Sequence, residues 1–404
     1  MDCKRVAVIG AGTMGSGIAQ SIARVGMEVV IIDVAQEPVD KAMGQIEGRM
    51  NKEVEKGKLT AEEKVHVMKQ IQGSVVLEDA RGADLVIEAA VEDLHIKEDI
   101  FWNLNRVCSP AAFFATNTST LSVTRLGALS GRPERFIGLH FFNPAHIMKP
   151  TEVVPGLTTS SEAVQFGVDF VKRLEKTPIV VQDCPGFIVN RILLPYVTEA
   201  FLAAGEGVSP AEIDDAVRKA GFPMGPLELN DMVGIDVSLH TFPILHDAYG
   251  DRFPVPPLPK KLYEAGRLGV KTKRGVYRDG KVDDEFRLIV EGLEDTATAR
   301  DVPFTADRLI VRQVNEAVYC LQEGIASAAD IDLAMVLGTG FPADRDGVGG
   351  PLHWADEKGL DHVLSMLEQY KELFGSRFWP HPLLKNYVHA RHVGRAAKRG
   401  FFAY

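Results

Sequence analysis

The sequence is poor in cysteine. Its 404 residues contain only four, none with C-x-x-C spacing, and these are Cys3, Cys108, Cys184 and Cys320. A disulfide framework or a structural zinc site needs cysteines at close, paired spacings, so the pattern argues against both and against a bound metal. We therefore expect reduced thiols and a cytoplasmic protein.

Long apolar runs and an excess of positive charge are also missing. No apolar run approaches the ~18 residues that a membrane-spanning helix needs. The N-terminal MDCKRVAVIG lacks the apolar segment and cleavage site of a signal peptide. The 45 lysines and arginines and 55 aspartates and glutamates give a net charge of −10, which argues against a nucleic-acid partner. Any anionic partner must be held by local basic residues or backbone N–H groups.

The chain is long enough for two or three domains, and its first part alternates strand and helix patterns. The short apolar runs of residues 5–182 are rich in Val and Ile without in/out alternation, as in strands buried on both faces. This predicts an α/β domain with a doubly wound, mostly parallel sheet. The expected strands are Val6–Ile9, Val29–Ile32, Ser74–Leu77, Leu85–Glu88, Phe113–Thr116, Phe136–Phe142, Glu152–Val154 and Ile179–Val181. The expected helices include Met14–Val25, Pro38–Lys56, Lys97–Val107 and Ala163–Leu174.

After Pro185 helical periods dominate, and the sequence repeats itself. NRILLPYVTEA at 190–200 aligns with DRLIVRQVNEA at 307–317, and GPLELNDMVGID at 225–236 aligns with GPLHWADEKGLD at 350–361. Ordered matches at Gly, Pro and Asp positions indicate a duplicated helical domain. The expected parts are a cofactor domain at 1–182, a helical domain at 183–280, a linker with one short helix at 281–302, and a second helical copy at 303–404.

A glycine-rich turn follows the first expected strand. Gly10-Ala11-Gly12-Thr13-Met14-Gly15 has the G-x-G-x-x-G pattern, in which the backbone approaches a pyrophosphate at a helix N-terminus. Asp33 ends the second strand, where a carboxylate accepts hydrogen bonds from the ribose of NAD and repels the 2′-phosphate of NADP. A tight turn with a surface aspartate is the alternative. FAD shares this fingerprint, but the remaining motifs favour a nicotinamide. The predicted cofactor is NAD, bound by Gly10, Gly12, Thr13, Met14, Gly15 and Asp33.

Polar residues at three strand or helix ends predict acid–base chemistry. His140 ends an apolar strand, and Glu152 in the next short strand can reach it if the chain folds back. Such a pair suits alcohol oxidation, because the imidazole takes the hydroxyl proton and the carboxylate orients it. Ser119 follows another strand and can donate to a substrate oxygen. The alternatives are a structural core histidine at His140 and a helix cap at Asn190, which opens the first helix beyond the sheet.

Several motifs together resemble the 3-hydroxyacyl-CoA dehydrogenase family between residue 4 and about residue 278. They are GAGTMGSGIAQ, VIEAAVED, ATNTSTLS, GLHFFNP, PGFIVNR, PMGPLELNDMVGID and GRLGVKTKRGVY. The resemblance implies a Rossmann-type domain followed by helical domains similar to the C-terminal domain of 6-phosphogluconate dehydrogenase. It implies NAD-dependent oxidation of (S)-3-hydroxyacyl-CoA to 3-oxoacyl-CoA in fatty-acid β-oxidation or butanoate-type metabolism.

The resemblance also implies roles for individual residues. His140 matches the family's catalytic base, Glu152 its carboxylate partner, Ser119 a substrate contact and Asn190 an active-site amide. The positions that match cofactor contacts are Glu92, Lys97, Asn143 and Lys271. Coenzyme A falls near Arg49 and Lys56 by the same analogy, although a solvated helix face is the alternative because Glu47, Glu53 and Glu55 interleave with the basic residues.

The second helical copy departs from compact relatives and resembles multifunctional fatty-acid oxidation proteins. Asp307 replaces Asn190 in this copy, so we expect it to be structural. The implied assembly is either a monomer whose two helical copies form an intramolecular pseudo-dimer or a homodimer. Two other functions stay open: a dehydrogenase of a free hydroxy acid, as in relatives resembling gulonate dehydrogenase or λ-crystallin, and a non-catalytic NAD-binding protein. Acyl chain length, reaction direction and pathway do not follow from the sequence.

Overall fold

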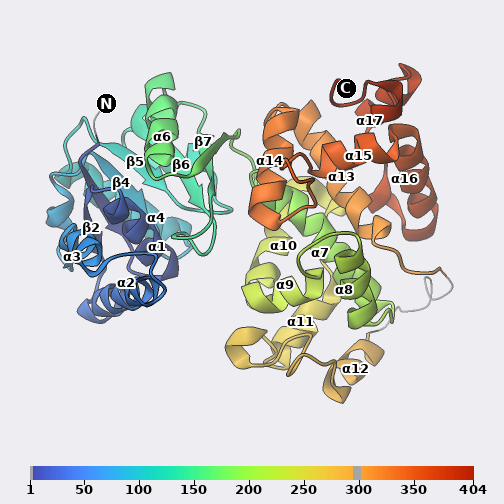
Figure 1. The fold of residues 1–404 in the computed structure, drawn as a ribbon, viewed down its shortest axis with the longest axis horizontal. Helices are drawn as coiled ribbons and strands as arrows, with labels where there is room; N and C mark the ends of the chain where they lie inside the picture. The colour runs from blue at the N-terminus through green and yellow to red at the C-terminus, as the bar shows by residue number, and fades with distance from the viewer. Residues whose placement is uncertain (1–2, 294–301) are drawn as a thin grey trace. The chain divides into compact units, whose positions relative to one another are not determined.

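The computed structural model describes residues 3–293 and 302–404 (Figure 1). The chain divides into two compact units, Met1–Phe187 and Ile188–Tyr404, each described here by itself. In the described residues, all eight named strands lie in the first unit and form one sheet, whereas the second unit is built from helices and turns. None of the helices in the described residues is both long enough and apolar enough to span a membrane.

The sheet of the first unit has the strand order β3-β2-β1-β4-β5-β6-β7-β8. Neighbouring strands are parallel except β6 and β7, which run antiparallel. The predicted doubly wound, mostly parallel sheet is therefore confirmed. The chain reverses its direction of travel across the sheet between β1 and β4, so their carboxyl ends flank a topological switch point. The strands are β1 (Arg5–Ile9), β2 (Glu28–Ile32), β3 (Ile71–Ser74), β4 (Leu85–Glu88), β5 (Phe113–Thr116), β6 (Phe136–Phe141), β7 (Pro150–Pro155) and β8 (Thr177–Val180).

Helices cover the sheet because its central strands are apolar on both faces. Val8, Ile31 and Ile87 belong to a buried core that also contains apolar residues of α1, α2 and α6. Phe101 of α4 packs edge-on against Phe136 of β6 with ring centroids 4.8 Å apart. The helices of this unit are α1 (Thr13–Arg24), α2 (Gln36–Glu55), α3 (Ala61–Lys69), α4 (Leu94–Val107), α5 (Val123–Leu129) and α6 (Ser161–Arg173), with the 3₁₀ turns η1 (Leu77–Ala80) and η2 (Pro133–Arg135).

The third strand is where the sequence prediction was wrong. Ser74–Leu77 was expected as a strand, but β3 ends at Ser74 and Leu77 begins η1. Val75 and Val76 are about half exposed. The edge strand β3 pairs with β2 alone, so it needs fewer apolar residues than a central strand, and its Gln-Gly segment conceals it in the sequence.

The second unit contains two successions of helices in the same order. The elements α7, α8, α9, α10, η3, α11 and η4 are followed by α13, α14, α15, α16, η5, α17 and η6, and α7 packs against α13 (Figure 1). A mostly helical region after the sheet is therefore confirmed, and its division into two domains stays a prediction, since Ile188–Tyr404 forms one compact unit. The first succession is α7 (Val189–Gly205), α8 (Pro210–Lys219), α9 (Pro226–Val233), α10 (Ile235–Tyr249), η3 (Gly250–Arg252), α11 (Pro257–Glu264) and η4 (Val270–Thr272). The second is α13 (Asp307–Gln322), α14 (Ala328–Thr339), α15 (Pro351–Lys358), α16 (Leu360–Phe374), η5 (Ser376–Phe378), α17 (Pro382–His389) and η6 (Arg395–Ala397).

Equivalent aspartates stabilise the two successions in the same way. Asp214 accepts hydrogen bonds of 3.0 and 3.1 Å from backbone N–H groups at the start of α9, and Asp332 accepts two of 2.8 Å at the start of α15. Between the successions, α12 (Asp284–Glu291) forms a short helix within the expected linker at 281–302. Residues 294–301 of that expected linker lie outside the described residues.

Candidate active site

The glycine-rich turn joins β1 to α1 at the carboxyl edge of the sheet. Gly10 has a φ of +107°, and a Cβ there would lie 2.5 Å from the carbonyl oxygen of Ala89 beyond β4. A Cβ on Gly15 would lie 1.9 Å from the Gly10 carbonyl oxygen. Both positions therefore need glycine for the turn itself. A Cβ on Gly12 would meet nothing within 4 Å, so the space beside this N-cap of α1 is open to a ligand.

Asp33 lies beside this turn at the end of β2. Its Oδ2 accepts a hydrogen bond of 2.7 Å from the Ala11 N–H, and its Oδ1 accepts one of 2.7 Å from the Val34 N–H. Two backbone donors thus orient the carboxylate, and each oxygen keeps a second lone pair for another donor. The structure brings the predicted glycines and Asp33 together at one edge of the sheet.

His140 and Glu152 face each other across the antiparallel pair β6–β7. Their Cα atoms are ladder partners, and Nδ1 of His140 lies 2.6 Å from Oε2 of Glu152. Both side chains are buried. The rings of Phe142 and Phe187 lie 4.7 and 5.7 Å from the imidazole ring, measured between centroids. The contact with Glu152 assigns the Nδ1 proton to that bond, so Nε2 carries the free lone pair of the neutral imidazole.

Polar contacts tie the end of β5 to its neighbours. The Asn117 side-chain oxygen accepts a hydrogen bond of 2.9 Å from the Phe141 N–H, next to His140. Glu92 accepts hydrogen bonds from the Thr118 hydroxyl and, at 3.0 Å, from the Ser119 N–H. Ser119 is thereby held at the same edge as His140, with its hydroxyl uninvolved in these two bonds.

A buried ion network supports Glu92. Lys97, which is 1% exposed, places Nζ 2.5 Å from Glu88 Oε1 and 3.2 Å from Glu92 Oε2. Burial alone raises the pKa of Glu92, but the Lys97 ammonium and the bonds from Thr118 and Ser119 outweigh it and hold the pKa below its usual range. Lys97, expected from the resemblance to touch the cofactor, thus has two carboxylate partners inside the protein.

Glu88 is a site residue that the sequence reasoning missed. It is fully buried at the end of β4, and it also accepts hydrogen bonds of 2.7 Å from the Thr116 hydroxyl and the Ala90 N–H. The sequence pattern that could have indicated Glu88 is a carboxylate at the carboxyl end of an otherwise apolar strand. A buried charge is retained only with partners, so such a residue predicts a cation nearby.

The remaining predicted residues belong to other elements. Arg49 of α2 donates from Nε to the Gln20 side chain at 2.7 Å, and burial lowers its pKa. Lys56 is exposed at the end of α2, and Asn143 is exposed beyond β6. In the helical unit, Lys271 pairs with Asp236 at the surface.

Asn190 also belongs to the helical unit, and its alternative role as a helix cap is wrong. It is the second residue of α7, whose N-cap is Ile188. Asn190 therefore stands two residues after the N-cap, inside the first turn, and this helix start has no side-chain cap hydrogen bond.

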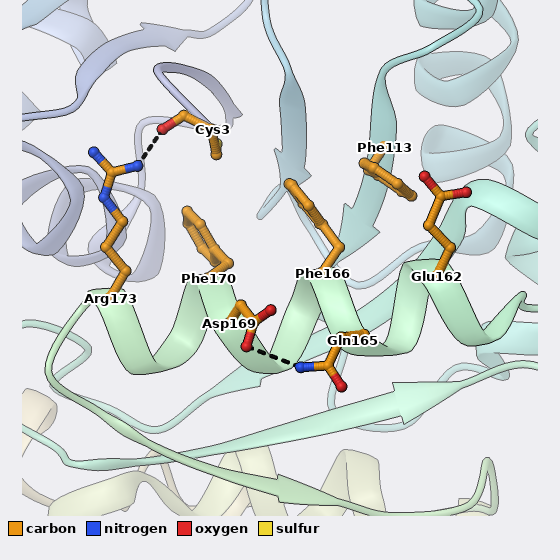
Figure 2. Close-up of a pocket in the computed structure, with 8 residues that line it drawn as sticks. All are labelled: Cys3, Phe113, Glu162, Gln165, Phe166, Asp169, Phe170 and Arg173. Carbon is orange, nitrogen blue, oxygen red and sulfur yellow. Dashed lines mark hydrogen bonds between the residues drawn. The ribbon is translucent and has the colours of Figure 1, made fainter. Parts of the chain in front are cut away.

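A separate hollow lies at the opposite end of the strands, along α6 (Figure 2). Phe113, Phe166 and Phe170 form its apolar side, and Arg173 donates to the Cys3 carbonyl at 2.5 Å. Cys3 precedes β1 and Phe113 begins β5, so this hollow lies at the amino ends of these strands. It is therefore not part of the candidate site at the carboxyl ends.

Comparison with protein families decides the relationship. The 3-hydroxyacyl-CoA dehydrogenase NAD-binding domain matches residues 5–184, and the C-terminal domain of the same family matches residues 186–279 and 304–404. This chain belongs to the 3-hydroxyacyl-CoA dehydrogenase family. The family is one of NAD-dependent oxidoreductases, and the glycine turn and Asp33 both lie within the residues that match its NAD-binding domain.

Individual relatives of this family member differ in length. 3-Hydroxybutyryl-CoA dehydrogenase from Escherichia coli K12 superposes with a TM-score of 0.87 at 33% identity, covering 96% of this chain and 99% of its own. (S)-3-Hydroxybutyryl-CoA dehydrogenase from Ralstonia eutropha has a TM-score of 0.67 at 39% identity and covers 69% of this chain and 100% of its own. The fatty acid oxidation complex subunit alpha of Psychrobacter sp. (strain PRwf-1) is 36% identical over 385 residues, 92% of this chain and 53% of the relative. The chain thus spans about half the length of such relatives.

Proposed function

We propose that this member of the family oxidises (S)-3-hydroxyacyl-CoA to 3-oxoacyl-CoA with NAD. The observation that carries the proposal is the buried contact of 2.6 Å between His140 and Glu152 at the carboxyl edge of an NAD-binding sheet. A histidine whose Nδ1 is held by a carboxylate presents Nε2 as a base, which the oxidation of a hydroxyl requires.

The proposed mechanism assigns a role to each of four side chains. His140 Nε2 takes the proton of the C3 hydroxyl as the C3–H bond breaks. Glu152 keeps the imidazole in the required tautomer and offsets the positive charge that His140 acquires. Ser119 and Asn190 donate hydrogen bonds to substrate oxygens as the C3 carbonyl forms. When bound, NAD supplies the acceptor for the hydride that leaves C3.

The residues at the glycine turn fit this cofactor. The open space beside Gly12 and the start of α1 accommodate a pyrophosphate, with contacts from the Gly10–Gly15 backbone, including Thr13 and Met14. Asp33 would accept hydrogen bonds from the adenosine ribose. Glu92, Asn143 and Lys271 complete the proposed cofactor contacts. Lys97 acts through Glu92, because its ammonium group is buried between Glu88 and Glu92.

Coenzyme A phosphates would be held by Arg49 and Lys56 on α2. The exposed position of Lys56 supports a solvent-facing phosphate contact. Arg49 is half-buried against Gln20, so it would contribute through its remaining guanidinium donors.

For the domains, we propose boundaries at 1–182, 183–280 and 303–404, with the last copy structural because Asp307 stands in place of Asn190. The packing of α7 on α13 supports an intramolecular pseudo-dimer of the two copies, with a monomer or a homodimer as the assembly. The four widely spaced cysteines, none with C-x-x-C spacing, support placing the enzyme in the cytoplasm.

A dehydrogenase of free oxo or hydroxy acids is the second candidate. A structural relative with 29% identity and a TM-score of 0.61 is described as a diketoreductase acting on dicarbonyl compounds. That relative supports keeping substrates without coenzyme A in the test. A non-catalytic NAD-binding protein is the third candidate.

One assay separates these candidates. NADH consumption is measured with acetoacetyl-CoA and, separately, with free acetoacetate and other free oxo acids. The proposal predicts turnover of the CoA ester and loss of at least about 10² in kcat for His140→Ala, with NAD binding retained. Turnover of free acids alone would establish the second candidate, and no turnover with intact NAD binding would establish the third.

A further inference from the structure

The two helical copies meet through a reciprocal network of buried ion pairs. Four positions carry the same residue in both copies: Arg191 and Arg308, Glu199 and Glu316, Glu206 and Glu323, and Arg252 and Arg377. Each arginine of this network contacts a glutamate of the other copy. The network therefore has the self-complementary form of an isologous interface, although it lies within one chain.

The distances support this equivalence. Arg308 lies 2.6 Å from Glu199 and 2.8 Å from Glu206, and Arg191 lies 2.8 Å from Glu316. The other equivalent contacts are Arg191 with Glu323 at 2.7 Å, Arg377 with Glu199 at 2.7 Å and Arg252 with Glu316 at 3.2 Å. Two copies of the first succession, or two of the second, would reproduce the same network. The ion pairs alone therefore cannot select which copies pair.

Arg312 breaks this symmetry. Its guanidinium donates to the Arg252 carbonyl at 2.7 Å and also to the Arg377 carbonyl. Because residues 252 and 377 are equivalent, a side chain that bonds both carbonyls lies on the pseudo-twofold axis. The equivalent position in the first copy is Pro195, inside α7, which has no side-chain donor.

We propose that Arg312 makes the pairing of the helical copies heterotypic, meaning that a first copy pairs with a second copy, because a second guanidinium on the axis would place two buried cations side by side. In this pair, four arginines and four glutamates of the network balance in charge. Arg312 adds one buried charge, and its two terminal guanidinium nitrogens donate to the two carbonyls. Two second copies would bring two guanidinium groups to the same axis, where the two buried positive charges would repel each other. The surface of the second copy thus accepts a first copy as its partner and rejects another second copy.

The surroundings of Arg312 agree with this assignment. The side chain is buried, and burial together with Arg377 and Arg252 lowers its pKa to about 10, against the opposing effects of Glu199 and Glu316. A second buried cation at the same place would lack carboxylate partners, because the four glutamates already face the four network arginines. This inference does not depend on the proposed enzyme activity.

The test uses the full chain and places two guanidinium groups on the pseudo-twofold axis within it. Pro195→Arg places a second arginine opposite Arg312, as two second copies would. Pro195→Leu is the matched control for losing the proline and adding bulk. Pro195→Arg combined with Arg312→Leu again leaves one arginine on the axis, supplied by the other copy. Melting temperature and urea midpoint are measured for each variant.

We expect Pro195→Arg to lower the melting temperature by at least about 6 °C relative to Pro195→Leu. The double variant should recover at least half of that loss. Arg312→Leu is thus expected to stabilise the chain that carries Pro195→Arg, which a structural role for either residue alone would not produce. Equal stability of the two single variants overturns the proposal, and so does a double variant no more stable than Pro195→Arg. If Pro195→Arg does not fold, a folded double variant supports the proposal and an unfolded one overturns it.

Discussion

Replacing Glu152 by glutamine tests the proposed acid–base pair with the smallest change in shape. The carboxylate contacts His140 Nδ1 at 2.6 Å, and both groups are buried. With about 4 Å between the centres of charge and an effective dielectric constant of about 20, the carboxylate stabilises the imidazolium by about 4 kcal/mol. Because a neutral amide oxygen still accepts a hydrogen bond, part of this is retained, and we expect Glu152→Gln to lower kcat by about 10²- to 10³-fold.

The assay for this variant is steady-state oxidation of NADH with acetoacetyl-CoA, together with direct titration of NAD binding. Glu162→Gln is the matched control, since Glu162 is exposed and its ion-pair partner in the described part of the chain is Arg135, at 3.5 Å across the surface. We expect the control to keep wild-type kcat and both variants to keep wild-type affinity for NAD. A loss in kcat below tenfold would refute the electrostatic reasoning. An equal loss of NAD affinity would show that Glu152 acts on the shape of the site instead.

Three further predictions concern the cofactor edge and the helical interface. Gly12→Leu should keep the wild-type melting temperature but weaken NAD binding at least about tenfold in a fluorescence titration, because its side chain fills open space; unchanged binding would place the cofactor elsewhere. Asp33→Ser should raise the ratio of kcat/KM for NADP over NAD at least about tenfold, and an unchanged ratio would remove Asp33 from cofactor selection. Burial raises the pKa of Glu199, but the Arg377 and Arg308 guanidinium groups outweigh it and lower this pKa from 4.5 to about 2. The ionised Glu199 therefore stabilises the fold by about 3 kcal/mol at neutral pH, and this stabilisation is lost as the pH falls from about 4.5 to 2. Glu199→Gln should therefore lower the urea midpoint at pH 7 and reduce the loss of stability between about pH 4.5 and 2. Glu316→Gln should lower the urea midpoint at pH 7 by less, because burial raises the Glu316 pKa by more than Arg191 and Arg252 lower it. Equal losses in the two variants would contradict this reasoning.

Local patterns were sufficient for most of the sheet. Leu85–Glu88 and Phe113–Thr116 are strands with the bounds that their apolar runs predicted, because central parallel strands are buried on both faces. The same rule failed at β3, where Val75 and Val76 look like a strand but are half exposed. The structure of that segment depends on its position at the sheet edge, which is a property of the whole fold.

Some contacts of the candidate site could likewise be predicted from the sequence, whereas others could not. The pairing of His140 with Glu152 was predicted as a possible contact between consecutive strands, and the antiparallel register of β6 and β7 provides it. The burial of Lys97 between Glu88 and Glu92 did not follow from the sequence, because those residues meet only after β4 and α4 pack together. The Arg–Glu pairs of the helical copies had a signal: identical charged residues at equivalent positions of apolar helices.

The register of β6 and β7 has a consequence for how this enzyme tolerates change. Backbone hydrogen bonds along the ladder, rather than the connecting segment at 142–149, set the alignment of His140 with Glu152. Insertions or deletions in that connection can alter the rim of the site without moving the pair. A slip of either strand by one residue would turn one of the two side chains to the opposite face of the sheet. Length variation among homologues is therefore expected to concentrate in the connection and to be absent from the two strands.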